Sequence, residues 1–199
     1  MKKLSLFAGL LLLGGCASYR ATPLNTISAP GSWMPWKARD VVVAARAFDE
    51  EDCKQYLDRD VISKGYRPVQ ITIENKSDSN YLFSLNRVSL PCARAEDVAE
   101  QVHTSTVGRT AGYGAAALFF WPFAIPAVVD GVRSVKANES LDLDFVSKVA
   151  KDQIIAAHAH VNMLMFVPES SFKNVFSITL IDLKTSEARE FKVHASSSL

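Results

Sequence analysis

The stretch 69–74 constrains the fold most strongly, because apolar and polar residues alternate along it without a break. One face carries Val69, Ile71 and Ile73, and the residues between them are polar. This period of two is typical of a β-strand with one buried face and one face in water. A turn rich in Asn, Ser and Asp follows at 75–80, and a second apolar strand begins directly after it. The pattern predicts a β-hairpin over these two strands.

Four more stretches have strand character, at 41–48, 161–167, 175–181 and 189–193. The last two are joined across a short polar turn at 184–186, which predicts a second hairpin. The third-last, 161–167, is apolar on nearly both faces, as expected for a central strand of a sheet. About six strands with hairpin connections predict a mainly β domain, an antiparallel sandwich of the immunoglobulin-like kind.

Helical signals lie between the strands. Asp49 is suited to cap a short helix that ends near Leu57, because acidic residues fill the first turn, where the helix dipole favours negative charge. A larger helical insertion, at about 94–155, interrupts the β pattern. It begins with an amphipathic helix from Ala95 and ends with a second helix that runs from Ser140 to about residue 155.

The middle of this insertion, Ala111–Val129, has no charged residue in 19 positions. Pro122 and Pro126 each remove a hydrogen-bond donor and would break a straight helix, so we expect an apolar helical hairpin that bends at 121–123. The hairpin either packs against the sheet or presents an aromatic tip to a membrane or a protein partner; a transmembrane span is a third alternative. The tip residues are Phe119, Phe120, Trp121 and Phe123.

The N-terminus has the layout of an export signal. Lys2 and Lys3 precede an uncharged apolar run of about 10 residues, roughly half of what a transmembrane helix needs. The next residues, Leu13-Gly14-Gly15-Cys16, resemble the lipobox of bacterial lipoproteins. The resemblance implies that Cys16 carries a diacylglycerol through a thioether, that residues 1–15 are removed, and that the new amine is acylated with a fatty acid such as palmitate.

Ala17 and Ser18 follow the cysteine, and no Asp stands directly after it. Within the lipoprotein resemblance this implies attachment to the outer membrane, with the domain in the periplasm. The expected organisation is a signal peptide at 1–15, a lipidated tether rich in proline and serine at 16–38, and a β-sandwich domain with the helical insertion at 39–199.

Two further cysteines, Cys53 and Cys92, would lie in the exported domain. An oxidising compartment favours a disulfide between them, and the alternative is two small buried residues that never meet. The charges almost balance, with 22 basic and 21 acidic residues, and removal of Lys2 and Lys3 would leave 20 against 21. Without a clustered basic stripe we do not expect nucleic-acid binding.

The sequence holds no recognisable catalytic set. His158 and His160 stand two apart and could form one side of a metal site, but no third ligand lies at a telling spacing. Neither a Gly-x-Ser-x-Gly elbow nor a glycine-rich phosphate loop is present. We therefore expect no catalytic residue, no metal and no cofactor.

These observations predict a non-enzymatic, lipid-anchored protein of the cell envelope that contacts membrane or an envelope protein through its apolar hairpin. The alternative is a periplasmic binding module for a lipid or another apolar ligand. Two stretches, Arg67–Asn75 and Phe119–Phe123, are similar to uncharacterised lipoproteins of Gram-negative intracellular bacteria. They cover a small part of the chain, and that resemblance implies no activity.

Overall fold

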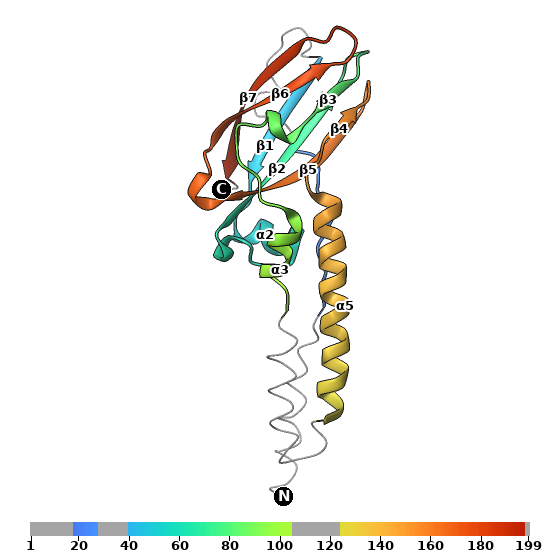
Figure 1. The fold of residues 1–199 in the computed structure, drawn as a ribbon, viewed down its shortest axis with the longest axis vertical. Helices are drawn as coiled ribbons and strands as arrows, with labels where there is room; N and C mark the ends of the chain where they lie inside the picture. Colours follow the sequence, from blue (N-terminus) through green and yellow to red (C-terminus); the bar gives the residue numbers. More distant parts are fainter. Residues whose placement is uncertain (1–17, 28–39, 105–123, 198–199) are drawn as a thin grey trace, which may run out of the picture. The chain divides into compact units, whose positions relative to one another are not determined.

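The computed structural model describes residues 18–27, 40–104 and 124–197, and it is mainly β (Figure 1). The strands are β1 (Val41–Ala47), β2 (Tyr66–Asn75), β3 (Tyr81–Phe83), β4 (Gln153–Ile155), β5 (His160–Pro168), β6 (Val175–Asp182) and β7 (Ala188–Ser197). The α-helices among the described residues are α2 (Glu50–Leu57), α3 (Ala95–Gln101) and α5 (Ala124–Lys148). Short 3₁₀ turns lie at Ile62–Lys64, Leu85–Arg87 and Glu169–Ser171. The prediction of a mainly β chain is confirmed.

The chain divides into two compact units. The larger comprises Ala21–Val102 and Asp144–Leu199 and contains all seven strands, and the smaller comprises Met1–Arg20 and His103–Leu143. In the smaller unit, the amide side chain of Asn138 on α5 accepts from the Thr104 amide at 2.9 Å and donates to the Thr104 carbonyl at 3.2 Å. This pair fixes the start of the inserted segment to the helix that ends it.

The seven strands form one mixed sheet in the order β4-β3-β6-β7-β1-β2-β5. All neighbouring pairs are antiparallel except β1 and β7, which run parallel. Strand β7 changes partner along its length: Ala188–His194 pairs with β6, and residues 195–197 pair with β1. One buried cluster takes side chains from every strand, so the sheet curls around a single core.

The two predicted hairpins differ in outcome. Strands β6 and β7 pair from Val175 opposite His194 to Ile181 opposite Ala188, which confirms that hairpin. The hairpin expected for the strands before and after 75–80 is wrong, because β2 pairs with β1 and β5 whereas β3 pairs with β4 and β6. The turn carries the chain from one part of the curled sheet to another, and adjacency in sequence gave no sign of this.

Strand β5 is buried on both faces although it ends the strand order. Met163, Met165 and Val167 belong to the core of the sheet. On the opposite face, the ring of Phe166 stacks on Phe145 of α5 with centroids 5.2 Å apart. The apolar character predicted a central strand, and the structure instead buries the second face under helix α5.

Two predicted helix starts are correct, at Asp49 and Ala95. Asp49 caps α2: its carboxylate accepts from the Asp52 amide at 2.8 Å, and the Asp52 carboxylate accepts from the Asp49 amide at 3.4 Å. Helix α3 begins at Ala95 as expected.

The third predicted start is wrong: the helix expected from Ser140 begins at Ala124. Pro126 lies in its first turn, where a backbone N–H has no partner within the helix, so the proline does not break it. The second helix of the insertion ends earlier than predicted, at Lys148, because residues 153–155 pair with β3 as strand β4.

Several predictions lie outside the described residues. These are the signal peptide, the lipobox and the bend at 121–123 of the apolar hairpin. Of the expected tether, the structure describes 18–27 and not 28–38. In the described parts of the chain, no helix is both long enough and apolar enough to cross a membrane.

Strand β4 provides a stability test because its neighbouring isoleucines differ in burial. Ile155 is 0% exposed and Ile154 is 59% exposed. We expect Ile155→Ala to lower the free energy of unfolding by about 2–5 kcal/mol, since it removes buried methylenes and leaves a cavity. Ile154→Ala, the matched control, should change it by about 0.5 kcal/mol or less. Urea unfolding of both variants measures the difference, and equal losses would contradict the register of β4.

Candidate functional site

The membrane-directed residues named from the sequence lie outside the described part of the chain. These are Cys16, the expected lipidation site, and the aromatic tip residues Phe119, Phe120, Trp121 and Phe123. Their roles stay predictions. The other named residues are described, and so are two polar arrangements that sequence reasoning missed.

Cys53 and Cys92 are free thiols in the structure, so the disulfide prediction is not supported. Cys53 is buried within α2, and Cys92 is half-buried after β3, with its thiol 3.8 Å from the Leu90 carbonyl. Burial raises the pKa of the Cys53 thiol to about 12 and that of Cys92 to about 11. Both thiols stay protonated at neutral pH, which makes them poor nucleophiles.

His158 and His160 do not form a paired strand face. His158 lies in the turn between β4 and β5 with a φ of 56°, and its Nε2 is 2.9 Å from a carboxylate oxygen of Asp78. His160 begins β5, exposed and opposite Glu74 of β2. Over the described ranges, no group of three His, Cys, Asp or Glu side chains could hold a metal ion.

The first arrangement missed from the sequence is a segment of the expected tether that lies on the sheet. We call Thr22–Ile27 the N-terminal strap. Two polar side chains of β2, Gln70 at 0% exposed and Thr72 at 3%, lie beneath it. Gln70 donates to the Asn25 carbonyl at 2.5 Å, and the Thr72 hydroxyl accepts from the Ile27 amide at 3.1 Å. The alternation in β2 predicted that this face meets water, and the strap covers it instead.

Further bonds fix the strap along its length. The Thr22 amide and hydroxyl both donate to the Gln55 carbonyl in α2, at 2.9 and 3.1 Å. Asn25 donates to the Tyr56 hydroxyl at 3.3 Å, and Asn162 of β5 donates to the Thr26 hydroxyl at 3.2 Å. The strap therefore runs from α2 across the outer faces of β2 and β5.

An arginine completes this polar face. Arg46 of β1 stands directly opposite Gln70 and donates to its side-chain oxygen at 3.3 Å. The guanidinium also lies 3.4 Å from an Asp52 carboxylate oxygen. Its central carbon is 5.4 Å from the ring centroid of Phe48 and 5.3 Å from that of Tyr56. Ion pair and cation–π contacts together hold α2 against the sheet.

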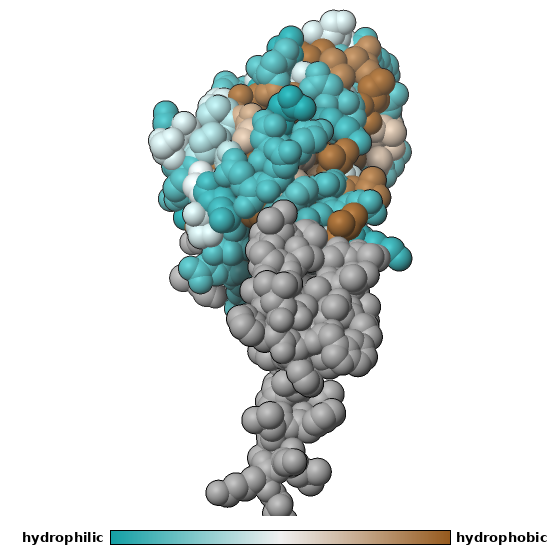
Figure 2. Space-filling model, turned by 60° about the horizontal axis from the view of Figure 1, so that its bottom comes forward, coloured by the Kyte–Doolittle hydropathy of each residue, from teal (hydrophilic) through white to brown (hydrophobic). Residues whose placement is uncertain are grey.

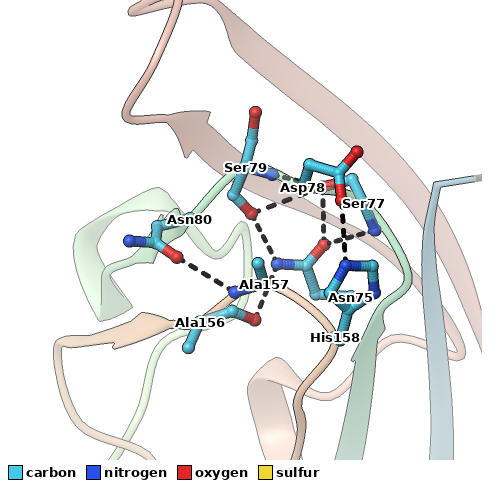
Figure 3. A network of polar contacts seen from close by, with 8 residues as sticks. All are labelled: Asn75, Ser77, Asp78, Ser79, Asn80, Ala156, Ala157 and His158. Carbon is cyan, nitrogen blue, oxygen red and sulfur yellow. Dashed lines mark hydrogen bonds and ion pairs between the residues drawn. The ribbon is translucent and has the colours of Figure 1, made fainter.

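The second arrangement is a polar cluster at the opposite end of β2 (Figure 3). Asn75 is 1% exposed. Its amide nitrogen donates to the carbonyls of Ser79 at 2.7 Å and Ala156 at 2.8 Å, and its oxygen accepts from the Ser77 amide and hydroxyl at 3.1 and 2.8 Å. One side chain thus joins the β2–β3 turn to the β4–β5 turn.

The β6–β7 turn joins the same end of the sheet. The Leu183 amide donates to the Asn80 carbonyl at 2.9 Å, and Asn80 in turn accepts from the Ala157 amide at 2.9 Å. Within the turn, the Asp182 carboxylate accepts from the Lys184 amide at 2.8 Å. Burial raises the pKa of Asp182, but these backbone bonds outweigh it, and the pKa lies below its ordinary value. We call the three joined turns, 75–80, 156–159 and 182–187, the turn end.

Other charged side chains support the frame. Arg67 of β2 donates two bonds to the Glu169 carboxylate, at 3.0 and 2.8 Å, which lowers the pKa of Glu169 below its usual value. Hydrogen bonds from the Ser84 hydroxyl and the Leu85 amide lower the pKa of Asp152. Because their pKa values are lowered, these carboxylates are weak bases, and their oxygens already accept structural hydrogen bonds.

In the view of Figure 2, the described residues present a mainly hydrophilic face, with apolar residues gathered along one side of it. On the outer face of the sheet, Leu82 of β3 stands between Ile154 of β4 and Ile181 of β6 in register. Half-buried polar residues, Ser177 and Thr179, continue that face along β6. The apolar row is therefore short, and isolated apolar residues on a surface are common in proteins.

Comparisons with known proteins add no family. No family model matches the chain, and no curated protein is similar to it in sequence. Function must therefore be argued from the residues and their arrangement alone.

The turn end provides a test of its central residue. Asn75→Ala leaves the carbonyls of Ser79 and Ala156 without their side-chain donor, so we expect it to lower the free energy of unfolding by about 2–4 kcal/mol. Lys76→Ala is the matched control, because Lys76 is the next residue along the chain and its side chain is 52% exposed. We expect this substitution to lower the free energy of unfolding by about 0.5 kcal/mol or less. Chemical denaturation measures both, and an Asn75→Ala variant as stable as the control would contradict the bonding described.

Proposed function

We propose that this chain is a lipid-anchored, non-enzymatic protein of the bacterial cell envelope. It is attached through Cys16 to the outer membrane, its folded domain lies in the periplasm, and its apolar segment at 111–129 contacts membrane or a protein partner. The observation that carries the proposal is the run from Lys2 to Cys16, with its basic start, short apolar core and lipobox-like end.

Lipid attachment fits the physics of the N-terminal run. A 10-residue apolar segment is too short to hold a domain in a bilayer as a helix. Each buried methylene of an acyl chain contributes about 0.8 kcal/mol, and two or more chains give durable anchoring. Cys16 lies just ahead of the strap, so a lipid there would attach directly to the folded domain.

The strand pairings support an immunoglobulin-like sandwich as the finer description of the fold. Strands β1, β2 and β5 are neighbours, and so are β4, β3, β6 and β7. The two groups meet where β7 passes from β6 to β1, and the β2–β3 connection crosses between them. Sandwiches of this architecture carry loops clustered at their ends and serve widely as binding and scaffold modules.

A non-enzymatic role is consistent with the chemistry of the described residues. The two free thiols have raised pKa values. The carboxylates with lowered pKa values accept hydrogen bonds within the fold, and His158 is an exposed turn residue paired with Asp78. These groups stabilise turns and strand ends, which suits a scaffold more than a reaction centre.

The test separates the lipid from the apolar segment. The full chain is expressed in a Gram-negative host beside a form in which Ala17–Leu199 follows an ordinary cleavable export signal. We expect the full chain to stay in membranes after an alkaline carbonate wash, and mass spectrometry to find acyl chains on Cys16. The lipid-free form should be released by the wash, because the apolar segment contacts the membrane without spanning it.

Three results would change the proposal. An unmodified Cys16 in an exported, soluble full chain would overturn lipid anchoring. A lipid-free form that resists carbonate would show that the segment 111–129 inserts by itself. Lipid extracted from the purified lipid-free form would favour a periplasmic carrier of apolar ligands over a contact role.

A further inference from the structure

The distance between the anchor and the folded domain is short. The strap is hydrogen-bonded to α2 at Thr22, six residues after Cys16. A fully extended chain spans at most about 3.6 Å per residue, so the lipidated residue lies within about 20 Å of Thr22. A lipid on Cys16, as proposed above, would therefore hold the domain close to the bilayer, on a connection shorter than the expected tether 16–38.

The strap also fixes which end of the domain is near the anchor. Thr22 contacts α2, and later strap residues pass along β2 to reach Thr72. Helix α2 follows the end of β1, beside the start of β2, whereas the turn end lies beyond Asn75. We call the end that contains α2 the helix end. Figure 1 shows α2 and α3 at one end of the strands and the β6–β7 turn at the other.

A second observation, independent of the strap, points to the same end. The inserted segment leaves the larger unit after α3 and returns through the last turn of α5. Gln101 at the end of α3 donates to the Tyr66 hydroxyl at 2.8 Å, and Lys148 of α5 donates to the Tyr56 carbonyl at 2.7 Å. Both connections of the insertion to the larger unit thus lie at the helix end, the end that Thr22 also contacts.

The exposed residues at the helix end are charged, so this end can face the headgroup layer without burying apolar surface in it. Glu50, Glu51 and Lys54 of α2 are exposed, as are Asp60 and Lys64 in the connection to β2. Both signs of charge are present, and such side chains stay hydrated at headgroup level and do not enter the hydrocarbon. From Val69 to Asn75 the strand rises about 20 Å. The turn end therefore lies about that far from the helix end, measured along β2.

We propose that the helix end faces the lipid headgroups and that the turn end, with Asp78, His158 and the β6–β7 turn, points away from the membrane. This orientation rests on the proposed lipid anchor at Cys16. It leaves the turn end as the end of the domain that is farther from the membrane.

The experiment uses the full lipidated chain with a fluorophore on one added cysteine, after Cys53→Ala and Cys92→Ser remove the native thiols. Lys54→Cys labels the helix end and Lys184→Cys labels the turn end, so the two variants lose the same charge at exposed positions. Each is bound to phosphatidylethanolamine–phosphatidylglycerol vesicles whose headgroups carry a nitroxide quencher. We expect at least a threefold stronger quenching at position 54 than at 184, because contact quenching falls off within a few ångströms.

A lengthened variant tests the role of the short connection. Insertion of twelve Gly and Ser residues between Arg20 and Ala21 should leave the protein on the vesicles and reduce the difference between the labels. Equal quenching at both positions in a lipidated, vesicle-bound protein would overturn the orientation and leave the anchor intact. A chain that mass spectrometry shows to be unlipidated, and that does not bind vesicles, would overturn the anchor and the orientation together.

Discussion

The structure depends on a polar face of β2 that is buried and must find hydrogen-bond partners. Gln70 and Thr72 point away from the core of the sheet and are nonetheless covered. An unpaired polar group at such a place costs about 1–3 kcal/mol, so the covering elements must supply donors and acceptors. Arg46 from β1, Asn162 from β5 and the backbone of the strap supply them. The N-terminal strap is therefore part of the fold.

This constraint links the architecture to the proposed attachment. The strap bonds to α2 at Thr22 and to Thr72 of β2 at Ile27, and these bonds fix its direction along the sheet. The residues that precede the strap therefore leave the domain beside α2. The insertion is connected to the larger unit at the same end, where Gln101 bonds to Tyr66 at the start of β2 and Lys148 bonds to Tyr56 of α2. A lipid on Cys16, as proposed, would then hold the helix end of the domain and leave the turn end available to other molecules.

The local features of the fold follow from the sequence because they depend on near neighbours. The cap at Asp49, the start of α3 at Ala95 and the β6–β7 hairpin are set by residues within a few positions. The pairing of β2 with β1 and β5 was not predictable in this way. An apolar face indicates that a strand is buried, but it does not indicate which strand pairs with it. The second helix of the insertion was likewise predicted to continue to about residue 155, but residues 153–155 pair with β3 and form strand β4.

In the candidate sites too, contacts between near neighbours were predictable and contacts between distant residues were not. Asn75 was assigned to a turn from its residue type, but its bonds to the β4–β5 turn join residues 81 positions apart. Gln70 and Thr72 were assigned to water because polar residues at alternate positions usually meet solvent. No side-chain pattern in the strap could have corrected this, because Gln70 and Thr72 bond to the Asn25 carbonyl and the Ile27 amide, backbone groups that almost any sequence supplies.

Hydrogen exchange of the strap amides tests the central claim, that Thr22–Ile27 folds with the sheet. The Ile27 amide donates to Thr72, so the account predicts slow exchange at Ile27 in the native protein and a large increase in its rate in Thr72→Val. Thr179→Val, a half-buried threonine on the outer face of β6, should leave Ile27 protected. Exchange at Ile27 as fast as in an unfolded peptide, in the native chain, would contradict the account.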